Sequence, residues 1–137
     1  MLSDKHSMLS NNELKDLLET LESLRNNVQW KEGKDVSHLN KRIKLEHLPS
    51  PASLSDYEML IFDLVRNGEN VLYSYEYTNN MYYGVRGFAK GQVNEWLVIF
   101  GVGGILETGF PPKNIDEYLE NRGFVLFGRI KEVLKWT

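Results

Sequence analysis

Apolar residues recur at helical spacing near the start of the chain. Ser10 and Glu13, three residues apart, have the spacing of a capping box at the beginning of a helix. Leucines at positions 14, 17, 18, 21 and 24 follow at the three- and four-residue intervals of one helix face. The pattern predicts an amphipathic helix over about residues 11–26. We expect this helix to cap the core, and the alternatives are pairing with a second copy or docking on a carrier.

Two further helices are predicted before residue 70. Residues 36–48 place Leu39, Ile43 and Leu45 on one side of a short helix, which Pro49 and Pro51 end. A third helix begins near Ser53, with Asp56 or the Ser55–Glu58 pair completing its cap, and stops at residues 67–68, an Asn-Gly pair. Its predicted buried stripe consists of Tyr57, Leu60, Ile61, Leu64 and Val65.

From residue 70 the hydrophobic period changes from the helical one to two. Tyrosines alternate with other residues over 71–77, and the Thr-Asn-Asn sequence at 78–80 is typical of a turn, so 71–77 and 81–88 predict a hairpin. The apolar runs 96–100 and 105–110 predict two more strands, joined through glycine-containing connections at 89–94 and 101–104. Four consecutive strands with short connections predict a four-stranded antiparallel meander.

The remaining residues complete an α+β fold. Residues 111–112, two prolines, stop the fourth strand, and Asn114 with Glu117 predicts the cap of a helix to Arg122, which Gly123 ends. Residues 124–127 predict a last strand. N-terminal helices, a meander sheet, a short helix and a last strand indicate the α+β class. We expect one compact domain overall, with residues 1–33 as an amphipathic helix and linker and 34–137 as the main α+β unit.

Composition narrows the function classes. The chain has 137 residues, of which 42% are hydrophobic, enough for one core. It contains no cysteine, which excludes disulfides, thiolate nucleophiles and iron–sulfur clusters. The sequence has neither a signal-peptide core nor an apolar run of the roughly 18–20 residues that span a membrane, so we expect a cytoplasmic protein without membrane contact, with export by a specialised system left open.

Net charge and the spacing of possible metal ligands narrow the function classes further. The net charge is −3, but residues 25–47 carry a net +3 and include two of the three histidines. No His-x-x-x-His or Asp-x-Asp-x-Asp spacing occurs, so we expect no metal and no cofactor. Residues 101–104 connect two strands without a following Lys-Ser/Thr, so they predict a hairpin turn rather than a phosphate loop. The Gly-x-Ser-x-Gly elbow of serine hydrolases is absent too.

The basic segment carries the first candidate chemistry. Lys44 and His47 are three apart, and on a helix they would project from one face. Cleavage of RNA without metal needs a group that takes the 2′-hydroxyl proton, an acid for the leaving 5′-oxygen and a cation for the phosphate, and histidine and lysine suit these roles. Thr108, at the end of a predicted strand, supplies a hydroxyl for a non-bridging oxygen. The alternative is that Lys44 and His47 close a helix C-terminus, where the dipole favours positive charge.

The predicted sheet carries the second candidate chemistry. Aromatic side chains such as Tyr82 and Tyr83 can stack nucleotide bases, although tyrosines are also ordinary strand residues that simply pack. Arg86 and Lys90 are candidates for phosphate contacts, with a solvated charge as the alternative for each. Together these four residues form a candidate substrate-binding set.

Several segments taken together resemble a known superfamily. They are Lys44-x-x-His47-Leu48-Pro49, the helix with Asp56-Tyr57, the tyrosine-rich hairpin, the run 96–100, and Gly104 through Pro111 with the sequence Gly-Ile-Leu-Glu-Thr-Gly-Phe-Pro. Over about residues 34–128 the chain is similar to the barnase/EndoU/colicin/RelE-like nucleases, which occur as bacterial polymorphic-toxin tips and in prophage proteins.

The resemblance implies a small metal-independent ribonuclease. In that superfamily, helices precede a four-stranded antiparallel sheet, and a helix-borne histidine or lysine acts with hydroxyl or basic residues on the sheet. The resemblance makes His47 the general acid or base, Lys44 the phosphate cation and Thr108 the phosphate-contacting hydroxyl, with RNA and a cognate antitoxin or immunity protein as partners. The alternative is a non-catalytic protein-binding module, immunity-like or a phage accessory protein, which the acidic net charge favours.

Overall fold

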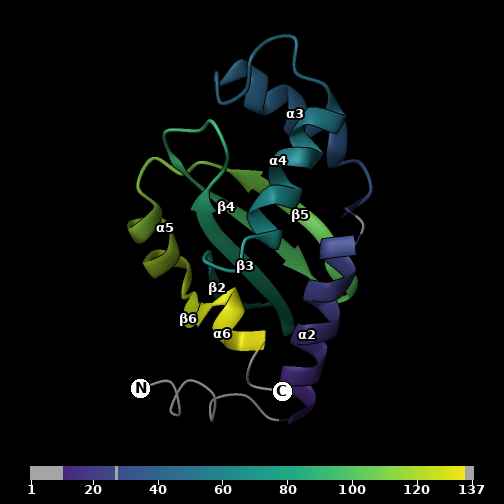
Figure 1. Cartoon of the computed structure of the whole chain (residues 1–137), viewed down its shortest axis with the longest axis vertical. Coiled ribbons are helices and arrows are strands. Elements are labelled where there is room, and N and C mark those ends of the chain that lie inside the picture. Colours follow the sequence, from purple (N-terminus) through teal and green to yellow (C-terminus); the bar gives the residue numbers. More distant parts are fainter. Residues whose placement is uncertain (1–10, 27, 135–137) are drawn as a thin grey trace.

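The chain folds around a six-stranded mixed sheet with the strand order β1-β5-β4-β3-β2-β6 (Figure 1). The computed structural model describes residues 11–26 and 28–134, except for the side chains of 11–14. The strands are β1 (Gln29–Trp30), β2 (Val71–Tyr77), β3 (Asn80–Phe88), β4 (Glu95–Gly101), β5 (Ile105–Phe110) and β6 (Val125–Arg129). The helices are α2 (Asn11–Asn26), α3 (Asp35–Lys44), α4 (Leu54–Arg66), α5 (Ile115–Arg122) and α6 (Ile130–Leu134).

The predicted α+β class is confirmed, and the predicted meander forms the centre of the sheet. Strands β2 to β5 pair in sequence order and antiparallel. The predicted sheet of four strands, however, is smaller than the observed sheet of six. β1 adds to β5 in parallel, and β6 pairs antiparallel with β2. The sequence does not predict β1, because two residues are too few to show an alternation of polar and apolar positions. The partner of β6 is decided by the path of the chain, which hydrophobic periodicity does not report.

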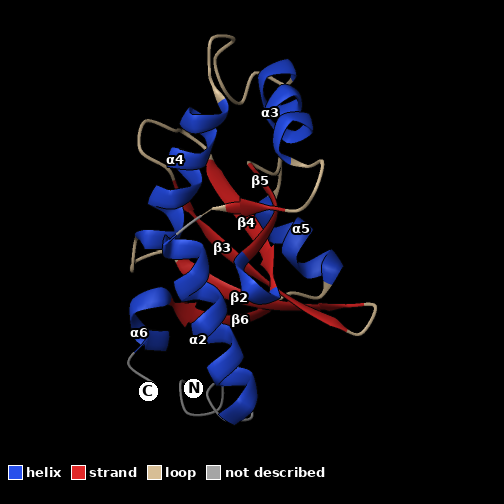
Figure 2. Cartoon of the chain, turned by 90° about the vertical axis from the view of Figure 1, so that its right-hand side faces the viewer, coloured by secondary structure: helices blue, strands red, loops and turns tan. Residues whose placement is uncertain are grey.

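Helices cover both faces of the sheet (Figure 2). α2, α4 and α6 pack on one face, where their apolar side chains join Trp96, Val98 and Phe100 of β4 in the larger hydrophobic cluster. α5 lies on the opposite face, where Ile115 and Leu119 pack against Leu97 and Ile99. This second face is covered over only part of its area, so it is the face on which polar side chains of the strands remain accessible.

The N-terminal helix belongs to the same core as the sheet. Its leucines at 17, 21 and 24 are buried in the larger cluster, as the core-capping prediction requires. Gly104 packs against this helix, since a Cβ at Gly104 would lie 2.8 Å from the backbone nitrogen of Leu24. Ser10 and the side chains of Glu13 and Leu14 lie outside the described residues. None of the described helices combines the length and the apolar character needed to cross a membrane.

The ends of α4 follow its sequence signals. Ser53 and Asp56 form the predicted capping box, with Ser53 Oγ accepting from the Asp56 amide at 3.1 Å and the Asp56 carboxylate accepting from the Ser53 amide at 2.9 Å. The hairpin turn is equally local: Thr78 and Asn79 both have positive φ, as a two-residue turn between twisted strands requires.

The second helix is shorter than predicted. α3 ends at Lys44 rather than near residue 48, and Glu46, with φ of 61°, turns the chain away. His47 therefore lies beyond the helix, and its amide donates to the Arg42 carbonyl oxygen in the turn that follows. The prediction that Lys44 and His47 share one helix face is wrong, because the turn at residues 45–47 precedes the prolines that we expected to end the helix.

Candidate active site

β5 carries Thr108 on the partly covered face of the sheet. Thr108 pairs with Ile99 of β4, and Ile99 pairs in turn with Gly84 of β3, so their side-chain positions share one face. Tyr82, two residues before Gly84, lies on the same face. Thr108, Tyr82 and Ile99 line a pocket of about 370 Å³, together with Lys31, Tyr75, Tyr77, Glu107, Tyr118 and Arg122. We refer to this as the tyrosine pocket.

A histidine from α3 meets Thr108 at this place. The Nδ1 atom of His38 lies 3.3 Å from Thr108 Oγ1, within hydrogen-bond distance. The His38 ring stacks on Trp30, with centroids 6.3 Å apart and planes 18° from parallel. Trp30 is held in turn by Glu58, whose carboxylate accepts from the indole nitrogen at 2.8 Å. The imidazole is therefore fixed by the parallel strand β1 as well as by its own helix.

The surroundings of His38 favour its neutral form. Burial lowers its pKa most, and the positive charges of Lys34, Arg42 and Lys41 lower it further. A neutral imidazole has one ring nitrogen free to accept a proton. His38 is thus suited to remove a proton from a hydroxyl group near neutral pH.

Tyr57 of α4 contacts β5 next to Thr108. Its hydroxyl donates to the Gly109 carbonyl oxygen and also makes a side-chain hydrogen bond with Thr108. Burial raises the pKa of Tyr57 to about 12, against the opposing effects of the Arg42 charge and of these hydrogen bonds. The phenol therefore stays protonated and holds β5 in place.

Arg42 lies behind this group as a buried cation. Its side chain is only 3% exposed, and within the described part of the chain its Nε and Nη1 atoms have no hydrogen-bond partner. The guanidinium carbon lies 5.5 Å from the centroid of the Phe110 ring. Burial lowers the Arg42 pKa. An unpaired buried cation is costly, and the charge of this one also lowers the pKa of His38.

Two cations and several aromatic rings complete the tyrosine pocket. Lys31 pairs with Glu107 at 3.5 Å, and the Arg122 guanidinium lies over the Tyr118 ring at 4.5 Å. Tyr75 and Tyr77 stack with centroids 6.0 Å apart. Among the described residues, no cluster of three or more histidine and carboxylate side chains could hold a metal ion.

The sequence-predicted catalytic residues are divided between two pockets. Lys44 and His47 line a separate pocket of about 520 Å³, with residues 43, 46 and 48–50, and this pocket shares no lining residue with the tyrosine pocket. The His47 ring meets Trp96 edge-on, and its Nδ1 is buried without a described partner. Burial and then the Arg42 charge lower the His47 pKa. Of the predicted trio, only Thr108 lies in the tyrosine pocket.

The predicted substrate-binding residues are also dispersed. Tyr82 lines the tyrosine pocket, but Tyr83 points to the other face and is buried in the larger core cluster. Arg86 is held by Glu95 through two hydrogen bonds of 2.9 and 2.8 Å, which raise its pKa, and it also pairs with Asp116. Lys90 is exposed in the connection between β3 and β4, apart from the residues that line the tyrosine pocket.

Sequence analysis missed His38 and Arg42 as site residues. They are four apart on a helix, which places both on one face, next to the apolar positions 39 and 43. A polar pair on the buried side of an amphipathic helix is the signal that could have found them. No protein-family model matches the sequence, and no curated protein or solved structure matches it either.

Proposed function

We propose that the protein is a small metal-independent ribonuclease, of the kind that the resemblance to polymorphic-toxin and prophage nucleases implies, with His38 and Thr108 at its reaction centre. The observation that carries the proposal is the 3.3 Å contact between His38 Nδ1 and the Oγ1 atom of Thr108, a residue that lines a pocket with tyrosine walls and two cations. A base, a hydroxyl donor, cations and stacking surfaces are what RNA cleavage needs.

The proposed reaction is an internal attack within RNA. Neutral His38 donates its Nδ1–H to Thr108 and takes the proton of a ribose 2′-hydroxyl on Nε2, and the 2′-oxygen forms a bond to the adjacent phosphorus while the bond to the 5′-oxygen breaks. The leaving 5′-oxygen takes a proton from water, and His38 returns its proton to solvent, which leaves a 2′,3′-cyclic phosphate. Thr108 donates to a non-bridging oxygen, and Arg122 and Lys31 compensate the charge that builds up on the phosphate.

The structure offers two histidines for a matched test. We expect His38→Gln to lower the cleavage rate at least about a hundredfold, the usual contribution of a general base, and His47→Gln to leave it within about threefold. Thr108→Val, which keeps the side-chain volume, should lower kcat about tenfold through the lost hydrogen bond to the phosphate. Cleavage of a fluorescent RNA in the presence of EDTA measures all three variants.

Each outcome bears on a specific assignment. If His47→Gln abolishes cleavage and His38→Gln does not, the active site is the pocket of Lys44 and His47. If neither variant changes the rate, both histidine assignments fail. If the wild-type protein cleaves no RNA and instead forms a stoichiometric complex with a protein from its own cells, the binding-module alternative replaces the ribonuclease.

A further inference from the structure

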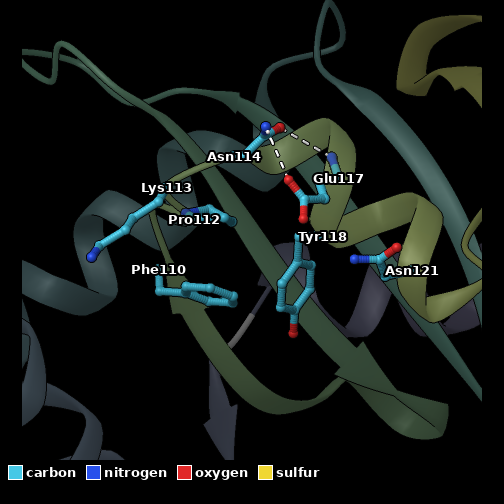
Figure 3. A pocket seen from close by; sticks show the side chains of 7 residues that line it. All are labelled: Phe110, Pro112, Lys113, Asn114, Glu117, Tyr118 and Asn121. Carbon is cyan, nitrogen blue, oxygen red and sulfur yellow. Dashed lines mark hydrogen bonds between the residues drawn. The ribbon is translucent and has the colours of Figure 1, made fainter.

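A second pocket adjoins the tyrosine pocket and shares a wall with it. It measures about 360 Å³ and lies between the end of β5 and α5, where Phe110, Pro112, Lys113, Asn114, Glu117, Tyr118 and Asn121 line it (Figure 3). We refer to it as the α5 pocket. Tyr118 belongs to both pockets. The two pockets are therefore adjacent.

The walls of the α5 pocket suit a flat, mainly apolar ring with polar edges. Phe110 from β5 and Tyr118 from α5 point toward one another, with ring centroids 5.2 Å apart and planes at 74° (Figure 3). Arg42 lies over Phe110 from the protein interior, so this ring is held before any ligand arrives. Nucleobases have this shape and stack on aromatic side chains whatever their sequence.

The polar side chains at the rim of the α5 pocket differ in whether they already make hydrogen bonds within the protein. Asn114 and Glu117 are tied to each other, since the Asn114 amide donates to the Glu117 carboxylate at 3.3 Å and Asn114 Oδ1 accepts from the Glu117 backbone nitrogen at 3.1 Å. The amide of Asn121 has no hydrogen bond within the described part of the chain, and Figure 3 shows it directed toward Tyr118. An amide both donates and accepts, so it can bond to the edge of a base.

Arg122 provides a positive charge next to Tyr118, the residue that both pockets share. Arg122 lines the tyrosine pocket, and its guanidinium lies 4.5 Å from the centroid of Tyr118, the shared residue. A phosphodiester that links a nucleotide in one pocket to a nucleotide in the other would pass this guanidinium. Arginine forms strong, oriented hydrogen bonds with phosphate oxygens.

We infer that the α5 pocket is a base-binding subsite, and that the substrate is single-stranded RNA in which a further nucleotide, beyond the two joined by the cleaved bond, is also bound. The inference rests on the proposed ribonuclease function and specifies its substrate. A base must be unpaired to enter a pocket with aromatic walls, so double-stranded RNA is excluded as the bound form. Dinucleotides that occupy only the tyrosine pocket should be poor substrates.

The test uses oligonucleotides with a single cleavable bond. One ribonucleotide is placed in an otherwise 2′-O-methylated strand, either in a dinucleotide or with two further nucleotides on each side. We expect Phe110→Leu to raise KM about tenfold for the long strand, the loss typical of one stacked base, and Asn121→Ala to raise it about threefold, with kcat unchanged for both. Neither variant should affect cleavage of the dinucleotide.

The helix also offers a matched control. Glu120→Ala changes an exposed residue of α5 that does not line either pocket, and it should leave KM within about twofold. Asn121 is exposed, so its variant tests the subsite even if Phe110→Leu lowers stability. If KM is the same for both strand lengths and for both variants, the subsite is overturned while the ribonuclease stands.

Binding of a strand that cannot be cleaved separates the two proposals. A fully 2′-O-methylated strand of the longer length lacks the attacking hydroxyl, and fluorescence anisotropy measures its affinity directly. If no RNA is cleaved but Phe110→Leu weakens this binding about tenfold, the subsite stands and the ribonuclease function fails. If the wild-type protein neither binds this strand nor cleaves RNA, both proposals are overturned.

Discussion

Replacement of the buried arginine by methionine should make the protein more stable. Arg42 is 3% exposed and two of its guanidinium nitrogens have no partner among the described residues. Methionine has a similar length, no charge and enough flexibility to fill the same space.

The expected gain follows from opposing contributions. Each buried N–H without a partner costs about 1–3 kcal/mol, so the two together destabilise the native state by about 2–6 kcal/mol. Arg42→Met also loses the cation–π contact with Phe110, worth about 0.5–2 kcal/mol. We expect the free energy of unfolding to rise by about 2 kcal/mol, within the range seen when buried charges are replaced by apolar side chains.

Urea unfolding followed by circular dichroism measures this change, and NMR titration follows His38. Removal of the Arg42 charge should raise the His38 pKa, which burial, Lys34, Arg42 and Lys41 now lower. Lys41→Met is the matched control, because it removes an exposed charge near the same histidine and should change stability by less than about 0.5 kcal/mol. A loss of 1 kcal/mol or more in Arg42→Met would refute the reasoning, since it would show that the guanidinium is paired in solution.

Two further predictions concern the glycine turn and pH. Gly104→Ala should destabilise the protein by at least about 2 kcal/mol, because φ is +78° and the new Cβ would approach the Leu24 backbone to 2.8 Å. Gly103→Ala should cost only about 1 kcal/mol, because its φ is +81° but the space around its Cβ is open. Equal urea midpoints for the two variants would contradict this prediction. His38 and His47 both have a lowered pKa in the folded state, so the unfolded chain binds more protons as pH falls through their ordinary value of 6.5. The free energy of unfolding should therefore decrease from pH 7.5 to 5.5, and the double glutamine variant should lose most of this dependence; a protein that becomes more stable on acidification would exclude it.

Local signals in the sequence determined most of the elements. α2 and β5 have the predicted bounds, and α4 has the predicted capping box, because caps, turns and hydrophobic periods act within a few residues. The left-handed residues Thr78 and Asn79 make the predicted hairpin turn in the same local way. The order of helices and strands alone was enough to indicate the α+β class.

Tertiary structure decided the edges of the sheet and the candidate site. The parallel pairing of Trp30 with Leu106 joins segments that are distant in sequence, and no local pattern encodes such a pairing. That pairing places Trp30 against the ring of His38. The early end of α3 places His47 beyond the helix, where its ring contacts Trp96. Thr108 is a candidate that the sequence predicts, but its histidine partner depends on how α3 packs against β5, a contact between residues 70 positions apart. Side-chain convergence at that separation is set by packing of the whole core.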